Sequence, residues 1–155
     1  MRRSPRSRWR NSSIAWTPRM RVETRARARA LQALYAWDVR GSNDLERVAT
    51  TIWDDLGIAL EERRIAGLLV RQVQQHGVEI DGDLVEVTTN WRLERLGAIE
   101  RSVLRVAAAE LRLGETPARV VIQEAIRLAE RYGSEQSARF VNGVVDALAR
   151  RMGRL

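Results

Sequence analysis

The sequence predicts an all-α protein. Apolar residues recur at three- and four-residue spacings from about residue 24 onward, and no segment alternates β-branched residues like a half-buried strand. Hydrophobic residues make up 45% of the chain and charged residues 30%, an ordinary balance for a folded domain. At 155 residues the chain is long enough for one domain, or for two small cores that share an interface.

We expect about seven helices, arranged as two small helical bundles that form one compact domain. The last three helices carry apolar stripes that complete a C-terminal bundle, and the helices before residue 90 form a separate N-terminal bundle. The expected helices lie near residues 24–40, 44–56, 60–76, 79–89, 91–113, 117–132 and 134–152.

Local sequence signals indicate where the first two helices begin and end. The segment RARARALQ at 25–32 alternates, but alanine and arginine both favour a helix, so this segment opens the first helix. Gly41 and Ser42 then break the chain, and Asn43 with Glu46 resembles a capping box for the second helix.

The later helices are bounded by similar signals. His76 precedes a glycine and lies at an expected helix end. Thr116 and Pro117 suit an N-cap and a first helical residue, while Gly133 and Ser134 suit a stop and a new N-cap. Helical spacing predicts three buried stripes: Ile99, Val103, Val106 and Leu111; Val121, Ala125, Leu128, Ala129 and Tyr132; and Val141, Val144, Val145, Leu148 and Met152.

Some residues inside the helices are expected to serve packing. Asn142 and Gly143 are poor helix formers within an apolar stripe. We therefore expect a close helix crossing at Gly143 and a hydrogen bond from the Asn142 side chain to a neighbouring backbone group. The aromatic residues expected in the core or at the interface between the bundles are Tyr35, Trp37, Trp91 and Phe140.

The excess positive charge lies at the N-terminus. The net charge is +7, and residues 1–22 hold seven arginines and no acid. The charges of residues 23–155 therefore sum to zero. Residues 1–22 are rich in Arg and Ser, contain Pro5 and Pro18 and lack hydrophobic periodicity, which predicts a disordered basic extension before a helical domain at 23–155. Met20 offers an alternative start, in which case residues 1–19 would not belong to the protein.

The composition disfavours catalysis, metal binding and membrane insertion. The chain has no cysteine and His76 is its one histidine, which leaves carboxylates as candidate ligands. No apolar run approaches the roughly 20 residues of a membrane span, and the N-terminus lacks the apolar segment of an export signal. We expect a cytoplasmic protein that is not an enzyme and uses no cofactor or metal. We interpret the acidic pairs as solvated helix surface: Asp54 with Asp55, Glu61 with Glu62, and Asp81 with Asp83.

Nucleic-acid binding has positive support in the first helix. Arg25 and Arg29 share one face with Gln32, whereas Arg27 points elsewhere, so guanidinium groups are presented in more than one direction. Such a cluster suits a phosphate backbone, although arginines on a solvated helix end would look the same. Trp9 and Trp16 alternate with arginines and are candidates for stacking on bases.

Three segments together resemble the NusB family of bacterial transcription antitermination factors. They are ALQALYAWD at 30–38, LERLGAIERSVLRVAAAEL at 93–111, and VIQEAIRLAERYGSEQSARFVNGVVDALAR at 121–150. The resemblance covers roughly residues 23 to 150, and GSEQSARFVNGVVD is its most specific string. It implies two helical bundles and binding of single-stranded, boxA-like RNA in nascent ribosomal RNA transcripts. The implied partners are the small-subunit ribosomal protein NusE and the RNA polymerase antitermination complex.

The resemblance also implies site residues. Gln136 stands where an acid is common in the family and Ala109 where an aromatic is common, and neither departure removes the motif. The implied contacts to the partner protein are Tyr35 and Glu100. The implied RNA-binding residues are Arg25, Arg27, Arg29, Gln32, Arg105 and Phe140.

Three other functions compete with RNA binding as explanations of this sequence. A related helical domain precedes the catalytic domain of an rRNA cytosine methyltransferase family, but 155 residues leave no room for a cofactor-binding domain. A helix-turn-helix DNA binder would need a base-reading helix, and the helix after Gly133 has a face that looks buried. A helical protein-interaction module without specific RNA binding is the main alternative.

Overall fold

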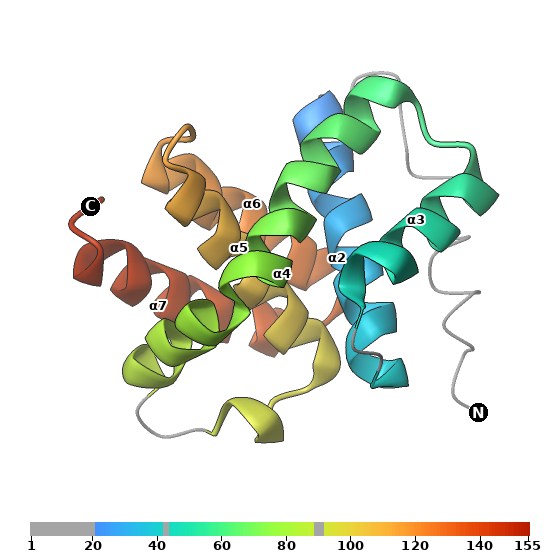
Figure 1. Ribbon diagram of the computed structural model, residues 1–155. Helices are drawn as coiled ribbons and strands as arrows, with labels where there is room; N and C mark the ends of the chain where they lie inside the picture. Colours follow the sequence, from blue (N-terminus) through green and yellow to red (C-terminus); the bar gives the residue numbers. More distant parts are fainter. Residues whose placement is uncertain (1–20, 42–43, 89–91) are drawn as a thin grey trace.

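The computed structural model describes residues 21–41, 44–88 and 92–155, and these residues are almost entirely helical (Figure 1). The all-α prediction is confirmed. The predictions for the basic extension, including Trp9, Trp16 and the alternative start at Met20, fall on residues outside this description. The elements are α2 Val22–Arg40, α3 Leu45–Leu56, α4 Leu60–Val87, the 3-10 turn η1 Leu93–Arg95, α5 Ala98–Leu113, α6 Ala118–Tyr132 and α7 Glu135–Arg151.

The helices form two groups that α4 and α5 join. Helices α2, α3 and α4 contact one another, and so do α5, α6 and α7. Helix α4 crosses the front of the molecule in Figure 1, and it also contacts α5 and α7, while α2 packs on α5. None of the described helices is both long and apolar enough to cross a bilayer.

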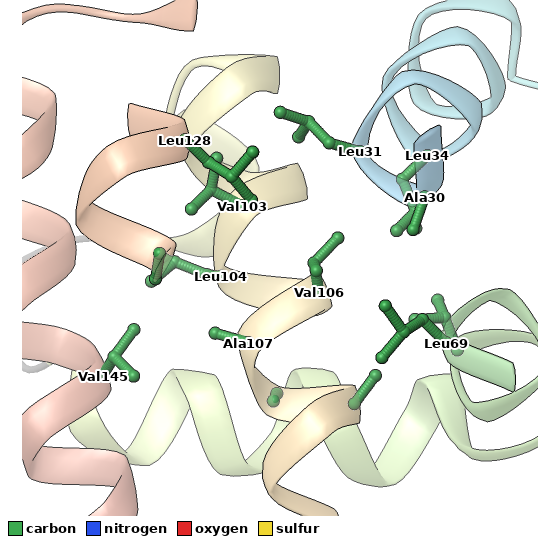
Figure 2. Close-up of a cluster of buried hydrophobic side chains, with 14 of the residues drawn as sticks. Ala30, Leu31, Leu34, Leu69, Val103, Leu104, Val106, Ala107, Leu128 and Val145 are labelled. Carbon is green, nitrogen blue, oxygen red and sulfur yellow. The ribbon is translucent and has the colours of Figure 1, made fainter. Parts of the chain in front are cut away.

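One continuous apolar core runs through both groups. Figure 2 shows side chains from α2, α4, α6 and α7 converging around α5. Because the core is continuous, displacing α5 would disturb both groups of helices. The buried side chains drawn there include Leu31 and Leu34 from α2, Leu69 from α4, Val103, Leu104 and Val106 from α5, Leu128 from α6 and Val145 from α7. The three predicted stripes of the C-terminal helices are buried except at Met152, which is partly exposed.

The expected helix count was too high because α4 is one helix. The predicted helices 60–76 and 79–89 join across a kink at His76, whose φ is −123° and ψ is 26°. Gly77 does not end the helix, since it lacks the positive φ of a left-handed C-cap such as Gly41 at the end of α2. The described residues therefore form six α-helices.

Three local predictions also needed adjustment. The start of the expected helix 91–113 is instead η1 followed by extended backbone at Leu96 and Gly97, and Trp91 lies outside the described residues. Thr116 does not cap α6, because its hydroxyl donates to Glu110 and the N-cap is Pro117. The N-cap of α3 is Asp44, and the predicted cap, Asn43, lies outside the described residues.

Two predictions about α7 had different outcomes. Ser134 caps the helix as predicted, because its hydroxyl accepts from the backbone N–H of Ser137 at 3.1 Å. The close helix crossing at Gly143 was wrong: Asn142 and Gly143 are exposed, and a Cβ on Gly143 would meet no heavy atom within 4 Å. The helix therefore keeps a glycine at a position where packing does not require one.

Candidate functional site

The start of α2 carries an arginine cluster organised by one carboxylate of α4. Arg25 Nε donates to Glu62 Oε1 at 2.9 Å, and Arg29 Nε contacts Glu62 Oε2 at 3.4 Å. Gln32 accepts from Arg29 Nη1 at 3.4 Å. We use the name arginine cluster for Arg25, Arg29, Gln32 and Glu62. It holds two positive charges and one negative charge, so its net charge is +1.

Helical spacing explains how the cluster forms. Positions 25, 29 and 32 are four and three residues apart, so their side chains lie on one face of α2, as predicted. That face meets the first turn of α4, where Glu62 is buried. The backbone oxygen of Arg29 also accepts from the Trp53 indole N–H at 3.3 Å, which ties this face to α3.

Arg27 lies on another face and is buried. Its guanidinium donates to Glu110 of α5 through Nε at 2.8 Å and Nη2 at 2.6 Å, and Glu124 of α6 lies 3.7 Å from Nη1. Only 7% of the Arg27 side chain is exposed, against 29% for Arg25. Burial alone would lower the pKa of Arg27, but the hydrogen bond and charge of Glu110 raise it, so the guanidinium of Arg27 stays charged. The structure therefore places Arg27 inside the helix packing, apart from the arginine cluster.

Arg105 is also engaged inside the fold. It donates to Asp81 of α4 through Nε at 2.9 Å and Nη2 at 3.0 Å, and to Asp38 of α2 at 3.1 Å. Its guanidinium lies 5.4 Å from the centre of the Trp37 ring, a cation–π distance. Asp38 also binds Arg101 of α5, so these groups form one network. The network joins α2, α4 and α5.

The charges of this network change the acidity of Asp38. Burial alone would raise the pKa of Asp38, but the hydrogen bonds and charges of Arg101 and Arg105 lower it below its ordinary value of 3.8. Arg101 also donates to three backbone carbonyls in residues 93–96, at 3.1, 3.4 and 2.7 Å. One arginine therefore ties the C-terminal end of α2 to the turn before α5.

The predicted partner-binding carboxylate lies where α5 meets α7. Glu100 in the first turn of α5 accepts a hydrogen bond from the hydroxyl of Ser137, in the first turn of α7. The absence of a Cβ at Gly97 gives the Glu100 carboxylate room to lie against the backbone. Phe140 follows Ser137 by one turn and is half-buried against the core. We call Glu100, Ser137 and Phe140 the α5–α7 junction.

The predicted site residues thus fall into separate groups. Arg25, Arg29 and Gln32 come together, whereas Arg27 and Arg105 are buried in ion pairs. Tyr35 is half-buried and lies ten residues beyond Arg25 on α2, which is about 15 Å along the helix axis.

The carboxylates that organise these groups were missed from sequence. The acidic pairs were interpreted as solvated surface, but Glu62 is buried and holds two arginines, and Asp81 binds Arg105. The interpretation was wrong for Glu62, whereas the Asp81 side chain is 37% exposed and is both solvated and paired. Helical periodicity gave a weak signal, since Glu62 precedes the buried Ala66 and Leu69 by four and seven residues.

Comparisons with known proteins agree with this architecture. Residues 24–150 match the model of the NusB family. Transcription antitermination protein NusB from Anaeromyxobacter dehalogenans (strain 2CP-1 / ATCC BAA-258) is 45% identical over 127 residues, which are 81% of this chain and 89% of that protein. The protein of the same name from Sorangium cellulosum (strain So ce56) is 40% identical over 137 residues, 88% of this chain and 97% of the relative.

Solved structures with the same fold are also similar in sequence. T. maritima NusB is 33% identical with a TM-score of 0.77, covering 83% of this chain and 90% of that one. A crystal structure of antitermination factors NusB and NusE in complex with dsRNA contains a chain that is 30% identical with a TM-score of 0.78. That match covers 85% of this chain and 98% of the other.

Proposed function

The chain belongs to the NusB family, and on that premise we propose that it is an RNA-binding transcription antitermination factor. It binds boxA-like RNA in nascent ribosomal RNA transcripts together with the ribosomal protein NusE. The observation that carries the proposal is the arginine cluster, which concentrates net positive charge on one face of α2 in a member of this family. A solved relative contains NusB and NusE in complex with dsRNA, which supports an assembly of this chain with NusE and RNA.

Within the cluster, Arg25 and Arg29 are the residues that contact RNA. Both are more exposed than Arg27 and lie at the start of a helix, where two guanidinium groups can reach successive phosphates. Gln32 orients Arg29 through its side-chain oxygen. Phe140 supplies a half-buried ring at the α5–α7 junction, suited to stacking on an unpaired base.

Arg27 and Arg105 contribute to RNA binding through the fold. Both direct all three guanidinium nitrogens at carboxylates inside the fold, so a phosphate contact from either would require breaking those ion pairs, which is costly. Glu62, by contrast, holds Arg25 and Arg29 at Nε. Both therefore position helices rather than meet the RNA.

Tyr35 and Glu100 contact NusE. Tyr35 lies beyond the arginine cluster along α2, and Glu100 belongs to α5, so both lie apart from the arginine cluster, while RNA and NusE meet at the α5–α7 junction through Phe140 and Glu100. The protein acts by assembly in the cytoplasm, as part of the RNA polymerase antitermination complex, and catalyses no reaction.

The proposal predicts that RNA and partner bind cooperatively. Adding NusE should raise the affinity for a boxA-like RNA by roughly tenfold, and the RNA should raise the affinity for NusE by the same factor, because coupling between two ligands is reciprocal. Calorimetric titrations of each ligand, with and without the other, measure both factors. RNA affinity that is indifferent to NusE would contradict the proposed joint assembly, and NusE binding without RNA binding would support a protein-interaction module instead.

A matched pair of variants tests the assignment of Glu100. Glu100→Ala removes the carboxylate and should weaken the NusE complex. Ser137→Ala removes only the hydroxyl that donates to Glu100, so it should leave NusE binding close to that of the parent protein. Equal losses in the two variants would show that the internal hydrogen bond, and no contact from Glu100 to the partner, is what matters.

A further inference from the structure

A buried carboxylate in the middle of a nucleic-acid-binding face is unexpected. Glu62 is 5% exposed and lowers the net charge of the arginine cluster from +2 to +1. A site selected only for strong attraction to phosphate would omit this acid, because each neutralised phosphate strengthens binding. The position of Glu62 therefore requires another explanation.

The geometry of the contacts supplies one. Each oxygen of Glu62 engages the Nε of a different arginine, Oε1 with Arg25 and Oε2 with Arg29. The carboxylate comes from α4, so both guanidinium groups are held against a second helix rather than by α2 alone. Charge-assisted hydrogen bonds of this kind fix the direction of an arginine as well as its charge.

We propose that Glu62 is a positioning residue that gives the arginine cluster its selectivity between RNA sequences. It holds Arg25 and Arg29 in the orientation that the specific complex uses, and it reduces attraction to any phosphate backbone. Phosphate contacts set the register of a protein on its nucleic-acid target. Arginines held in one orientation therefore favour an RNA whose bases are correctly placed for contact in that register. The inference rests on the proposed RNA-binding function.

Glu62→Gln is the decisive variant because it removes the charge and keeps the shape. With the net charge of the cluster at +2, binding to a scrambled RNA should become tighter, and its dependence on salt should steepen by about 0.7 in log–log slope. The preference for a boxA-like RNA over the scrambled RNA should fall by roughly tenfold, the equivalent of one charge-assisted contact. A residue that served only folding would change neither the salt slope nor the preference.

Two further variants control for the loss of a negative charge and for the length of the side chain. Glu61→Gln removes the same charge one residue earlier, where the side chain is exposed and pairs with Arg64, and it should keep the preference. Glu62→Asp keeps the charge but is one methylene shorter, so it cannot hold both arginines equally well. It should keep the parent salt slope and lose part of the preference, and it decides the question if Glu62→Gln does not fold.

The experiment is a salt series of RNA titrations on the full chain with NusE present, with thermal unfolding of every variant. A lower preference combined with tighter scrambled-RNA binding in Glu62→Gln, and not in Glu61→Gln, supports the inference. An unchanged preference, or equal weakening for both RNAs with an unchanged slope, overturns it. If the parent protein itself shows no preference, the proposed function fails, and that result is seen before any variant is compared.

Discussion

At the residue scale, arginines that look alike in the sequence differ in their partners. Sequence spacing correctly placed Arg25, Arg29 and Gln32 on one face and Arg27 on another. It could not identify Glu110 as the partner of Arg27, because 83 residues separate them and periodicity describes only one helix at a time. Burial of a charged residue becomes visible only when the helices are placed together.

Arg27→Ala is expected to destabilise the protein rather than remove an RNA contact. The change leaves Glu110 buried without its main partner, which should lower the free energy of unfolding by about 3 kcal/mol. Urea unfolding measures this loss directly.

Arg150→Ala provides the control, because Arg150 forms an exposed pair with Asp146 on α7, and its loss should cost less than about 1 kcal/mol. At temperatures where the Arg27 variant remains folded, the salt slope of RNA binding should equal that of the parent protein. A shallower slope with unchanged stability would instead assign Arg27 to the RNA.

At the element scale, the sequence located the helices better than it located their ends. The apolar stripes correctly predicted the buried faces of α5, α6 and α7. The helix end predicted at His76 is a kink with non-helical dihedrals inside α4, and the helix resumes beyond it, with Val73 buried before the kink and Ile80 after it. Gly143 shows the opposite error, since a glycine inside a helix suggested tight packing that is absent.

The network at the end of α2 makes the packing of α2 on α5 sensitive to acid. The pKa of Asp38 is lower in the folded protein than its ordinary value of 3.8, so the folded state binds fewer protons there than the unfolded state. Its contribution to stability is therefore present above that ordinary value and is lost as the pH falls through the folded pKa. Asp38→Asn should reduce stability at neutral pH and flatten the loss of stability on acidification, measured by urea unfolding at several pH values.

Asp55→Asn removes a carboxylate from an exposed position of α3 and serves as the control for a general change in charge. It should leave both the neutral stability and the acid slope close to those of the parent protein. If both variants flattened the acid slope equally, the effect would come from net charge and the network would not be its cause.

At the scale of the whole molecule, the fold brings the arginine cluster and the α5–α7 junction onto one core. Helix α2 carries the arginine cluster near its start and contributes Asp38 near its end to the network with α5. Helix α5 carries Arg101 near its start, where it binds Asp38, and Glu110 near its end, where it binds Arg27, so α2 and α5 are held together at both ends. The resemblance seen in three sequence segments implied this fold. The ion pairs that stabilise it could be identified only once all the helices were placed together.

The proposed function requires that the protein recognise a specific single-stranded RNA when NusE is present. A competition experiment tests it most directly: a labelled boxA-like RNA is displaced from the complex of this protein and NusE by unlabelled competitors of equal length. We predict that the boxA-like RNA competes best, and that scrambled RNA and duplex DNA compete more weakly, because sequence-specific recognition of RNA usually reads unstacked bases. Equal competition by all three nucleic acids would contradict the claim.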